Sequence, residues 1–456
     1  MRRYQALLAA FLFLVFSLPL TAFASETSAT IGLPAGTHQE QKSVPDLSMP
    51  AAAPKAQSPD LSPHHGTIQQ EQENTPSVVS ANSGYNLHAY NSNEVASRAV
   101  EKSIGLFSNT IRERFSLWLS RSGKYLDLMK EILREKNVPE SIVFLSLIES
   151  GFNPNAYSVA QAAGPWQFIA STARRYGLEI DWWKDERRDP VKSTGAAASY
   201  LKDLYKMFGS WNLAMAAYNA GEGKIQKAMK RSNADNYWAL LGTSHIKTET
   251  KEYVPRFIAA SLIATNPQEF GFQDIEYHEP LSFDVVELDS PLDLSVVAEC
   301  AGTTLDEIKR LNPELRRWCT PPDAANYQLR IPTGTKEQFL AALASIPGND
   351  RFTIDRYTVK KGDTFARIAK KTGIPVSTIL SLNSLEKIIP LKSGSEIYLP
   401  PKGLYSLDSV DKATIKKASY RKKVTHKRTG KKVAHKRTGK KVSSKKSHRI
   451  NQGKKI

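Results

Sequence analysis

The sequence has little cysteine and no long apolar segment, and both absences narrow the class of protein. Two cysteines among 456 residues cannot build a disulfide-rich scaffold, and no Cys/His spacing resembles a zinc site. The apolar run over residues 6–20 is shorter than the roughly 20 residues that a membrane-spanning helix needs. With 41% hydrophobic and 24% charged residues, the chain is neither a polytopic membrane protein nor wholly disordered.

The first residues are typical of a targeting segment. Arg2 and Arg3 precede the apolar run, and Ala22-Phe23-Ala24 follows it. A short basic region, a short apolar core and an A-x-A site together predict a secretory signal peptide over residues 1–24. We therefore expect export to the periplasm or cell envelope. The alternative is an uncleaved segment, which would keep the chain in contact with the membrane.

Acidic residues are absent from the end of the chain, where 19 Lys and Arg lie between Lys412 and Ile456. The 44 basic residues elsewhere are balanced by 45 acidic ones, so the net charge of +18 comes from a basic low-complexity tail, residues 402–456. The tail repeats a basic nonapeptide, beginning at Val424 and Val433, which favours nucleic-acid binding as an alternative function. Export and the lack of stacking aromatic residues after Tyr420 argue against it. We expect no nucleic acid and a loose interaction with anionic envelope polymers.

Composition divides the rest of the chain. Residues 25–95 are rich in Pro, Ser, Gln and Asn, and they lack the apolar residues that would offset the entropy of ordering, which predicts a flexible spacer. Over residues 96–270, apolar residues recur three and four positions apart, as Phe115, Trp118 and Leu119 do. Strand-like alternation is almost absent there, so an all-α domain is predicted.

Residues 284–333 and 356–401 form an internal repeat, with an offset of 71 over its central segment. Each copy predicts a strand, two short helices and a closing strand, which is a small α+β (βααβ) module. In the second copy Gly362-Asp363-Thr364 opens the first helix, which Asp363 can N-cap, and Asn383 follows the second helix. This pattern resembles a LysM module, a family that binds N-acetylglucosamine-containing glycans. The first copy has Pro291-Leu292-Asp293 instead of the Gly-Asp-Thr segment, which leaves its glycan binding open.

Both cysteines, Cys300 and Cys319, fall in the first copy. In the oxidising compartment that export implies, a bridge between them would close a loop of about 20 residues and contribute about 3 kcal/mol. We predict this disulfide; the alternative is two buried free thiols.

A candidate acid lies near the end of a segment, residues 139–151, that is nearly apolar all round and so predicts a buried helix. Glu149 faces the negative end of the helix dipole there, and apolar surroundings further disfavour its ionised form. Both effects raise its pKa toward the value that a general acid needs at neutral pH. The alternative is a solvated helix end before Gly151.

Four segments, in this order and spacing, resemble the lysozyme-like soluble lytic transglycosylases. They are the polar turn after Glu149, residues 152–158, and then residues 162–169, 216–223 and 250–256. With the LysM-like copies behind them, residues 100–401 resemble the membrane-bound lytic murein transglycosylase D family. Two features depart from that family: the lipid-anchoring cysteine of some members is missing, and the basic tail lies outside the pattern.

The resemblance implies peptidoglycan glycan strands as substrate and Glu149 as the catalytic acid and base. It also implies that Gln167 orients the N-acetyl sugar and that the Ser158 hydroxyl assists its acetamido group. Trp166, in contrast, is expected to pack in the interior. The cleft is expected to be lined by two aromatic residues and one amide, which suit sugar faces and polar groups: Tyr218, Asn219 and Tyr253.

Within the matched motifs Glu149 is the one plausible acid, because Glu222 sits in a glycine turn and Asp181, Asp185 and Asp189 belong to a Trp-rich polar loop. A lone acid fits a substrate-assisted reaction, in which the N-acetyl group of the sugar stabilises the anomeric carbon. The predicted product is a 1,6-anhydro-N-acetylmuramic acid end, formed without metal or cofactor. The alternatives are a hydrolase like the goose-type lysozymes and a non-catalytic wall-binding scaffold.

Overall fold

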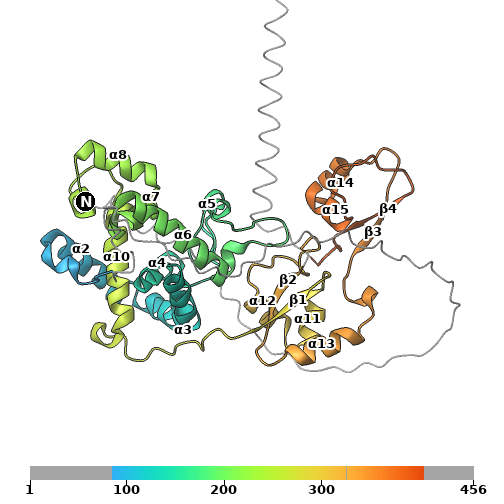
Figure 1. The fold of residues 1–456 in the computed structure, drawn as a ribbon, viewed down its shortest axis with the longest axis horizontal. Helices are drawn as coiled ribbons and strands as arrows, with labels where there is room; N and C mark the ends of the chain where they lie inside the picture. Colours follow the sequence, from blue (N-terminus) through green and yellow to red (C-terminus); the bar gives the residue numbers. More distant parts are fainter. Residues whose placement is uncertain (1–84, 325, 405–456) are drawn as a thin grey trace, which may run out of the picture. The chain divides into compact units, whose positions relative to one another are not determined.

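The computed structural model describes residues 85–324 and 326–404 (Figure 1). Up to residue 270 the described chain consists of helices, with isolated β-bridges but no strand, as the all-α prediction requires. Its α-helices are α2 (Glu94–Gly105), α3 (Arg112–Glu135), α4 (Phe144–Ser150), α5 (Ala170–Arg175), α6 (Pro190–Phe208), α7 (Trp211–Ala220), α8 (Glu222–Ser232), α9 (Tyr237–Leu241) and α10 (Thr248–Thr265).

These helices share one hydrophobic core because each turns an apolar face inward. In α3, for example, Phe115, Leu119 and Leu133 are fully buried at helical spacing. α10 is buried over most of its length and packs against α2, α4 and α7 (Figure 1). This packing brings together the ends of segments that are far apart in the sequence.

Residues 85–95 belong to this helical region, so the spacer prediction was wrong for them. The Tyr85 hydroxyl donates a hydrogen bond to Asn212 Oδ1 (2.6 Å), and its ring meets Phe257 edge-on with 5.5 Å between centroids. Leu87 and Tyr90 also pack against the core. A few apolar side chains anchor this otherwise polar segment because the helices already provide a surface that receives them. The predicted signal peptide, the spacer up to residue 84 and the tail from residue 405 lie outside the described residues.

Both copies of the repeat form the predicted βααβ unit, and in each the two strands pair antiparallel (Figure 1). Asp284 pairs with Ile331 in the first copy, and Asp355 pairs with Leu399 in the second. The first copy comprises β1 (Asp284–Leu288), α11 (Leu294–Cys300), α12 (Leu305–Leu311) and β2 (Tyr327–Ile331); the second comprises β3 (Asp355–Thr358), α14 (Phe365–Thr372), α15 (Val376–Leu382) and β4 (Glu396–Leu399).

An asparagine after the second helix ties each copy together. The side chain of Asn312 accepts a hydrogen bond from the Arg330 backbone N–H (2.9 Å) and donates one to the Arg330 carbonyl (2.7 Å). Asn383 does the same with the backbone of Tyr398, at 2.8 and 2.9 Å. An amide can pair both ways with one residue of the closing strand, which explains why the repeat carries Asn at this position.

Two features of the modules differ from the predictions for them. Thr364, not Asp363, is the N-cap of α14, because its side chain accepts from the backbone N–H of Arg367 (3.2 Å). The Asp363 carboxylate instead accepts from the Tyr357 hydroxyl (2.7 Å) and the Lys360 backbone N–H (2.9 Å). An additional helix, α13 (Lys336–Ser345), follows β2 and packs against α11.

Cys300 and Cys319 are buried free thiols, so the predicted disulfide is not formed. Cys300 packs in the core of the first module, whereas Cys319 packs with Trp182 and Trp183 of the helical region. The two side chains thus pack in separate apolar clusters as free thiols, which is the alternative to the predicted bridge.

Within the described residues, no helix combines the length and the apolar character that crossing a membrane requires.

Candidate active site

The candidate acid lies in the last turn of α4, which a short 3-10 turn, Glu140–Val143, precedes. Gly151 ends the helix with a positive φ of 60°. A Cβ at this position would lie 2.3 Å from the Trp118 ring, so only glycine combines this conformation with this packing. The Arg121 guanidinium donates to the Gly151 carbonyl (2.7 Å) and so holds the end of the helix from α3.

Glu149 is half-buried, and its carboxylate accepts a hydrogen bond of 2.5 Å from the Tyr253 hydroxyl. Burial raises the pKa of Glu149 to about 7, while the hydrogen bond from Tyr253 opposes that rise. A pKa raised toward neutrality brings the protonated form within reach of the pH at which an exported enzyme works. Such a group can donate a proton in one step and accept one in the next.

Tyr253 lies on α10, where Pro255 interrupts the helical hydrogen bonds. Proline has no N–H, so the carbonyl of Lys251, four residues earlier, loses its partner in the helix. The buried Tyr237 hydroxyl supplies that partner, at 2.8 Å from the Lys251 carbonyl and 2.9 Å from that of Thr250. α9 thereby supports the turn of α10 that carries Tyr253.

The loop that carries Gln167 is fastened to the end of α4. The hydroxyls of Ser146 and Ser150 both donate to the Pro165 carbonyl, at 3.1 and 2.8 Å. Gln167 has a positive φ of 48°, and its amide donates to the carbonyl of Gly164 (2.9 Å) within the same turn.

The other side of this loop is held by a buried ion pair. Arg187 pairs with both carboxylate oxygens of Asp185 (2.8 and 2.7 Å) and donates to the carbonyls of Gln161 (2.8 Å) and Phe168 (2.9 Å). A Cβ on Gly164 would lie 1.7 Å from the Arg187 carbonyl oxygen, so the close approach of these two segments requires glycine there. The loop is therefore rigidly placed beside α4.

Tyr218 and Asn219 come from the end of α7. The Tyr218 hydroxyl donates to the carbonyl of Trp166 (2.7 Å), and burial, followed by the nearby Glu149 charge, raises the pKa of this tyrosine well above its usual range. Asn219 Oδ1 accepts from the buried Thr250 hydroxyl of α10 (3.0 Å). Trp166 is fully buried and donates from Nε1 to Thr194 (2.8 Å), as the predicted packing role requires.

In the structure, some of the predicted site residues interact with Glu149 directly, and others are connected to α4 through neighbouring residues. Tyr253 hydrogen-bonds the Glu149 carboxylate, and Tyr218 lies within its electrostatic reach. Gln167 is linked to α4 through the Pro165 loop. Ser158 accepts from the backbone N–H of Ala162 (3.0 Å), and no contact with Glu149 is found for it in the described part of the chain.

Other carboxylates of the helical region form hydrogen bonds or ion pairs with residues other than the site residues. Glu222 accepts from Tyr200 (3.2 Å) and Arg175 (3.4 Å), and its pKa is lowered chiefly by a backbone hydrogen bond. Asp185 holds Arg187, and Asp189 caps α6. In residues 85–270 these bonds leave Glu149 as the acid whose pKa is raised to about 7.

Sequence reasoning missed the residues that support the site, notably Ser150, Asp185, Arg187 and Tyr237. Their partners are backbone carbonyls and side chains in other segments, so no local pattern reveals them. Ser150 had one signal, since it directly follows the candidate acid.

Three parts of the chain match known domain families. Residues 128–241 match the transglycosylase SLT domain, residues 282–348 match the LysM-like domain of lytic transglycosylase MltD, and residues 357–400 match the LysM domain. The chain therefore carries an SLT domain followed by LysM-like domains, which is the order that the motifs and the repeat predict.

Individual relatives are lytic transglycosylases. The chain is 34% identical over 280 residues to the membrane-bound lytic murein transglycosylase D of Escherichia coli (strain K12), covering 58% of this chain and 61% of that one. It is 28% identical over 159 residues to the membrane-bound lytic murein transglycosylase C of Mannheimia succiniciproducens, covering 29% of this chain and 44% of that one. The 70 kDa soluble lytic transglycosylase of Escherichia coli is a solved structure with 25% identity and a TM-score of 0.29, covering 34% of this chain and 26% of that one. The chain thus spans about three-fifths of the length of the first of these relatives.

Proposed function

We propose that this protein is a peptidoglycan lytic transglycosylase that cleaves the β-1,4 bond between N-acetylmuramic acid and N-acetylglucosamine. One observation carries the proposal: Glu149, with a pKa of about 7, is held by Tyr253 at the end of α4 in a domain of the SLT family. The similarity to the lytic transglycosylases named above supports the same activity.

The first step is proton transfer from the Glu149 carboxyl group to the glycosidic oxygen. The bond between that oxygen and C1 of N-acetylmuramic acid breaks, and the carbonyl oxygen of the sugar's own acetamido group stabilises C1. Glu149 is left as a carboxylate. Tyr253 donates to that carboxylate and stabilises it at this stage of the reaction.

In the second step the Glu149 carboxylate takes the proton of the 6-hydroxyl of the same sugar. The 6-oxygen attacks C1 and displaces the acetamido oxygen, which gives the 1,6-anhydro ring and restores the carboxyl group. No water is consumed. One acid acts twice, so the mechanism requires neither a second carboxylate nor a metal or cofactor.

The remaining site residues are proposed to hold the substrate. Gln167 and Ser158, on the loop beside α4, orient the acetamido group, while Tyr218, Asn219 and Tyr253 line the cleft against sugar faces and hydroxyls. The supports described above hold the Gln167 loop, Tyr218 and Tyr253 in place. A site held in place favours a bound sugar whose geometry is already close to that of the reacting sugar.

The LysM-like modules are proposed to hold the enzyme on the wall after export to the periplasm or cell envelope. Two weak glycan sites joined to the SLT domain raise its effective concentration at the glycan strands. The basic tail, which lies outside the described residues, is proposed to add a charge-dependent contact with anionic envelope polymers.

Product analysis of purified murein tests the proposal. Mass spectrometry should find 1,6-anhydro ends from the wild-type chain, and the folded Glu149→Gln variant should be slower by at least 10²-fold because its one proton donor and acceptor is gone. Products that are one water heavier would instead assign the protein to the hydrolases. Cleavage by Glu149→Gln within about tenfold of wild type would remove Glu149 from the mechanism.

A further inference from the structure

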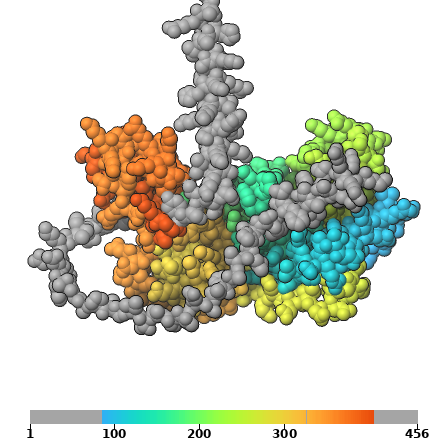
Figure 2. Space-filling view, turned by 180° about the vertical axis from the view of Figure 1, so that it is seen from behind, coloured from blue at the N-terminus to red at the C-terminus, as the bar shows by residue number. Residues whose placement is uncertain are grey.

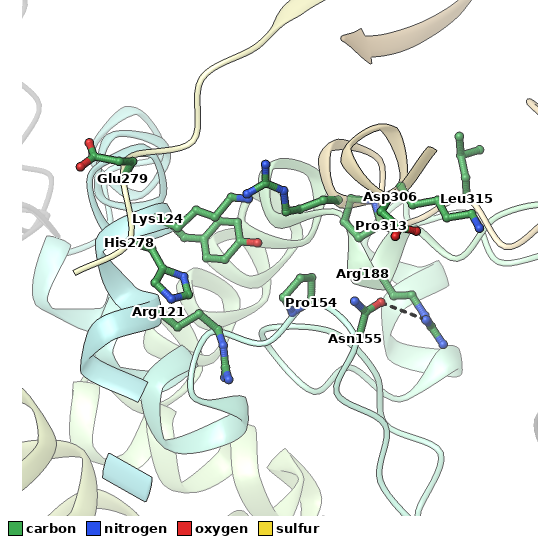
Figure 3. Close-up of a pocket in the computed structure, with 13 residues that line it drawn as sticks. Arg121, Lys124, Pro154, Asn155, Arg188, His278, Glu279, Asp306, Pro313 and Leu315 are labelled. Carbon is green, nitrogen blue, oxygen red and sulfur yellow. Dashed lines mark hydrogen bonds between the residues drawn. The ribbon is translucent and has the colours of Figure 1, made fainter. Parts of the chain in front are cut away.

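A cavity of about 790 Å³, whose lining does not include Glu149, has walls from the helical region and from the first module (Figure 3). Arg121 and Lys124 of α3 line one wall, and Lys309 and Arg310 of α12 line another. Pro154 and Asn155, from the turn that follows α4, also line the cavity.

The two sides of the cavity are joined by backbone and side-chain bonds. The backbone N–H of Asp185 donates to the Glu314 carbonyl (2.9 Å), and that of Arg316 donates to the Trp183 carbonyl (2.9 Å). Arg330 of β2 also pairs with the buried Asp189 at the start of α6 (2.7 Å). The surfaces of the helical region and of the first module are seen in Figure 2. These bonds give the cavity defined walls.

The charge of the lining is mainly positive, with five Lys or Arg side chains and two carboxylates, Glu279 and Asp306. Arg310 pairs with Glu307 outside the lining, but neither Lys124 nor Lys309 forms an ion pair in the described part of the chain. Within the lining itself, positively charged side chains therefore outnumber carboxylates.

Lys124 is the least exposed of the lysines that line the cavity, with 9% of its surface exposed. Its ammonium group lies 5.8 Å from the Tyr125 ring centroid, and no hydrogen bond to the group is found within residues 85–324 and 326–404. Burial, followed by repulsion from Arg310, lowers the pKa of Lys124 to about 8. A lowered lysine pKa means that the surroundings disfavour the ammonium form, and an anionic ligand in the cavity would favour it.

The cavity is also connected to the catalytic segment. Arg121, which lines it, donates to the carbonyl of Gly151, two residues after Glu149. Pro154 and Asn155 follow in the same turn, and Figure 3 shows Asn155 hydrogen-bonded to Arg188 at the cavity (3.3 Å). The cavity lining and the candidate acid therefore belong to one continuous segment, in which Pro154 lies five residues after Glu149.

We propose that this cavity binds the carboxylates of the acidic peptide that murein strands carry on their N-acetylmuramic acid residues. The inference rests on the proposed function, because that function supplies the strand. The cavity gives the enzyme a preference for glycan whose peptide is still attached, and the first module thereby contributes to substrate choice.

Two variants test the site. Lys309→Glu reverses an exposed charge at the cavity, and Lys124→Met removes the charge of Lys124 while keeping an apolar chain of similar length. The matched control is Lys336→Glu, an exposed lysine of α13 in the same module and outside the cavity lining. Thermal unfolding should show that all three full-length variants are folded.

The substrates are soluble glycan fragments that carry peptides, and the same fragments after an amidase has removed the peptides. For Lys309→Glu and Lys124→Met we expect kcat/KM to fall about fivefold on the peptide-bearing fragments and to stay within about twofold on the bare ones. Lys336→Glu should match wild type on both. Equal losses on the two substrates, or no loss on either, would overturn the peptide site.

A wild-type chain that cleaves neither substrate would instead contradict the proposed function. Calorimetric titration of both kinds of fragment into the full chain then decides the site separately. Tighter binding of the peptide-bearing fragments, weakened by Lys309→Glu, supports it. Equal binding of both kinds of fragment refutes it.

Discussion

Tyr253→Phe should move the alkaline limb of the pH–activity profile to higher pH. Tyr253 donates the 2.5 Å hydrogen bond to the Glu149 carboxylate, so it stabilises the ionised form and lowers the pKa of Glu149. The first step needs the protonated form, and activity should therefore be lost as pH rises through that pKa. Removing the Tyr253 hydroxyl therefore raises the pKa of Glu149 further, and the alkaline limb of the profile moves to higher pH with it.

The size of the change follows from the strength of the hydrogen bond. A hydrogen bond to a charged group contributes about 1.5–3 kcal/mol, and about 1.4 kcal/mol corresponds to one pH unit. The midpoint, near pH 7 in the wild type, should thus move up by about one to two pH units. The absolute rate should fall as well, because the carboxylate formed in the first step loses its stabilising donor.

The assay is kcat/KM on soluble glycan fragments from pH 5 to pH 9, since this ratio reports the free enzyme. Tyr200→Phe is the matched control, because the Tyr200 hydroxyl donates to Glu222 (3.2 Å) instead and its ring packs on Tyr218. The control should leave the limb in place. If Tyr253→Phe is too slow to assay, carbon NMR titration of the Glu149 carboxyl group measures the same pKa. An unchanged or lowered midpoint would refute the reasoning.

Two further predictions concern the modules. Arg330→Ala should lower the free energy of unfolding by about 3–5 kcal/mol in urea denaturation, because it leaves the buried carboxylates of Asp189 and Glu314 without their cation. A loss below about 1 kcal/mol would show that this ion pair does not link the helical region to the first module. Asn383→Ala should lower the free energy of unfolding by about 1–3 kcal/mol and speed up amide hydrogen exchange in β4, because the backbone of Tyr398 loses both of its hydrogen-bond partners. Unchanged exchange at Tyr398 would contradict this prediction.

Local patterns in the sequence were sufficient for much of the fold. The apolar periodicity around Phe115 predicted α3, and the repeated spacing predicted both βααβ units, because a helix face or a strand pair is recorded within a few residues. The candidate acid was also found locally, since Glu149 ends an apolar helix. Its roles and those of its neighbours came from motif resemblance and remain proposals.

Tertiary packing decided what joins these segments. Tyr253 meets Glu149 across 104 residues, and Arg187 fastens a loop 19 and 26 residues away, contacts that no period in the sequence records. Packing also placed Cys300 and Cys319 in different apolar clusters. It brought Tyr85 against the core, although composition had predicted a flexible spacer there. The pKa of Glu149 belongs to this second group, because the degree of burial and the partner of a side chain are set by segments distant in the chain.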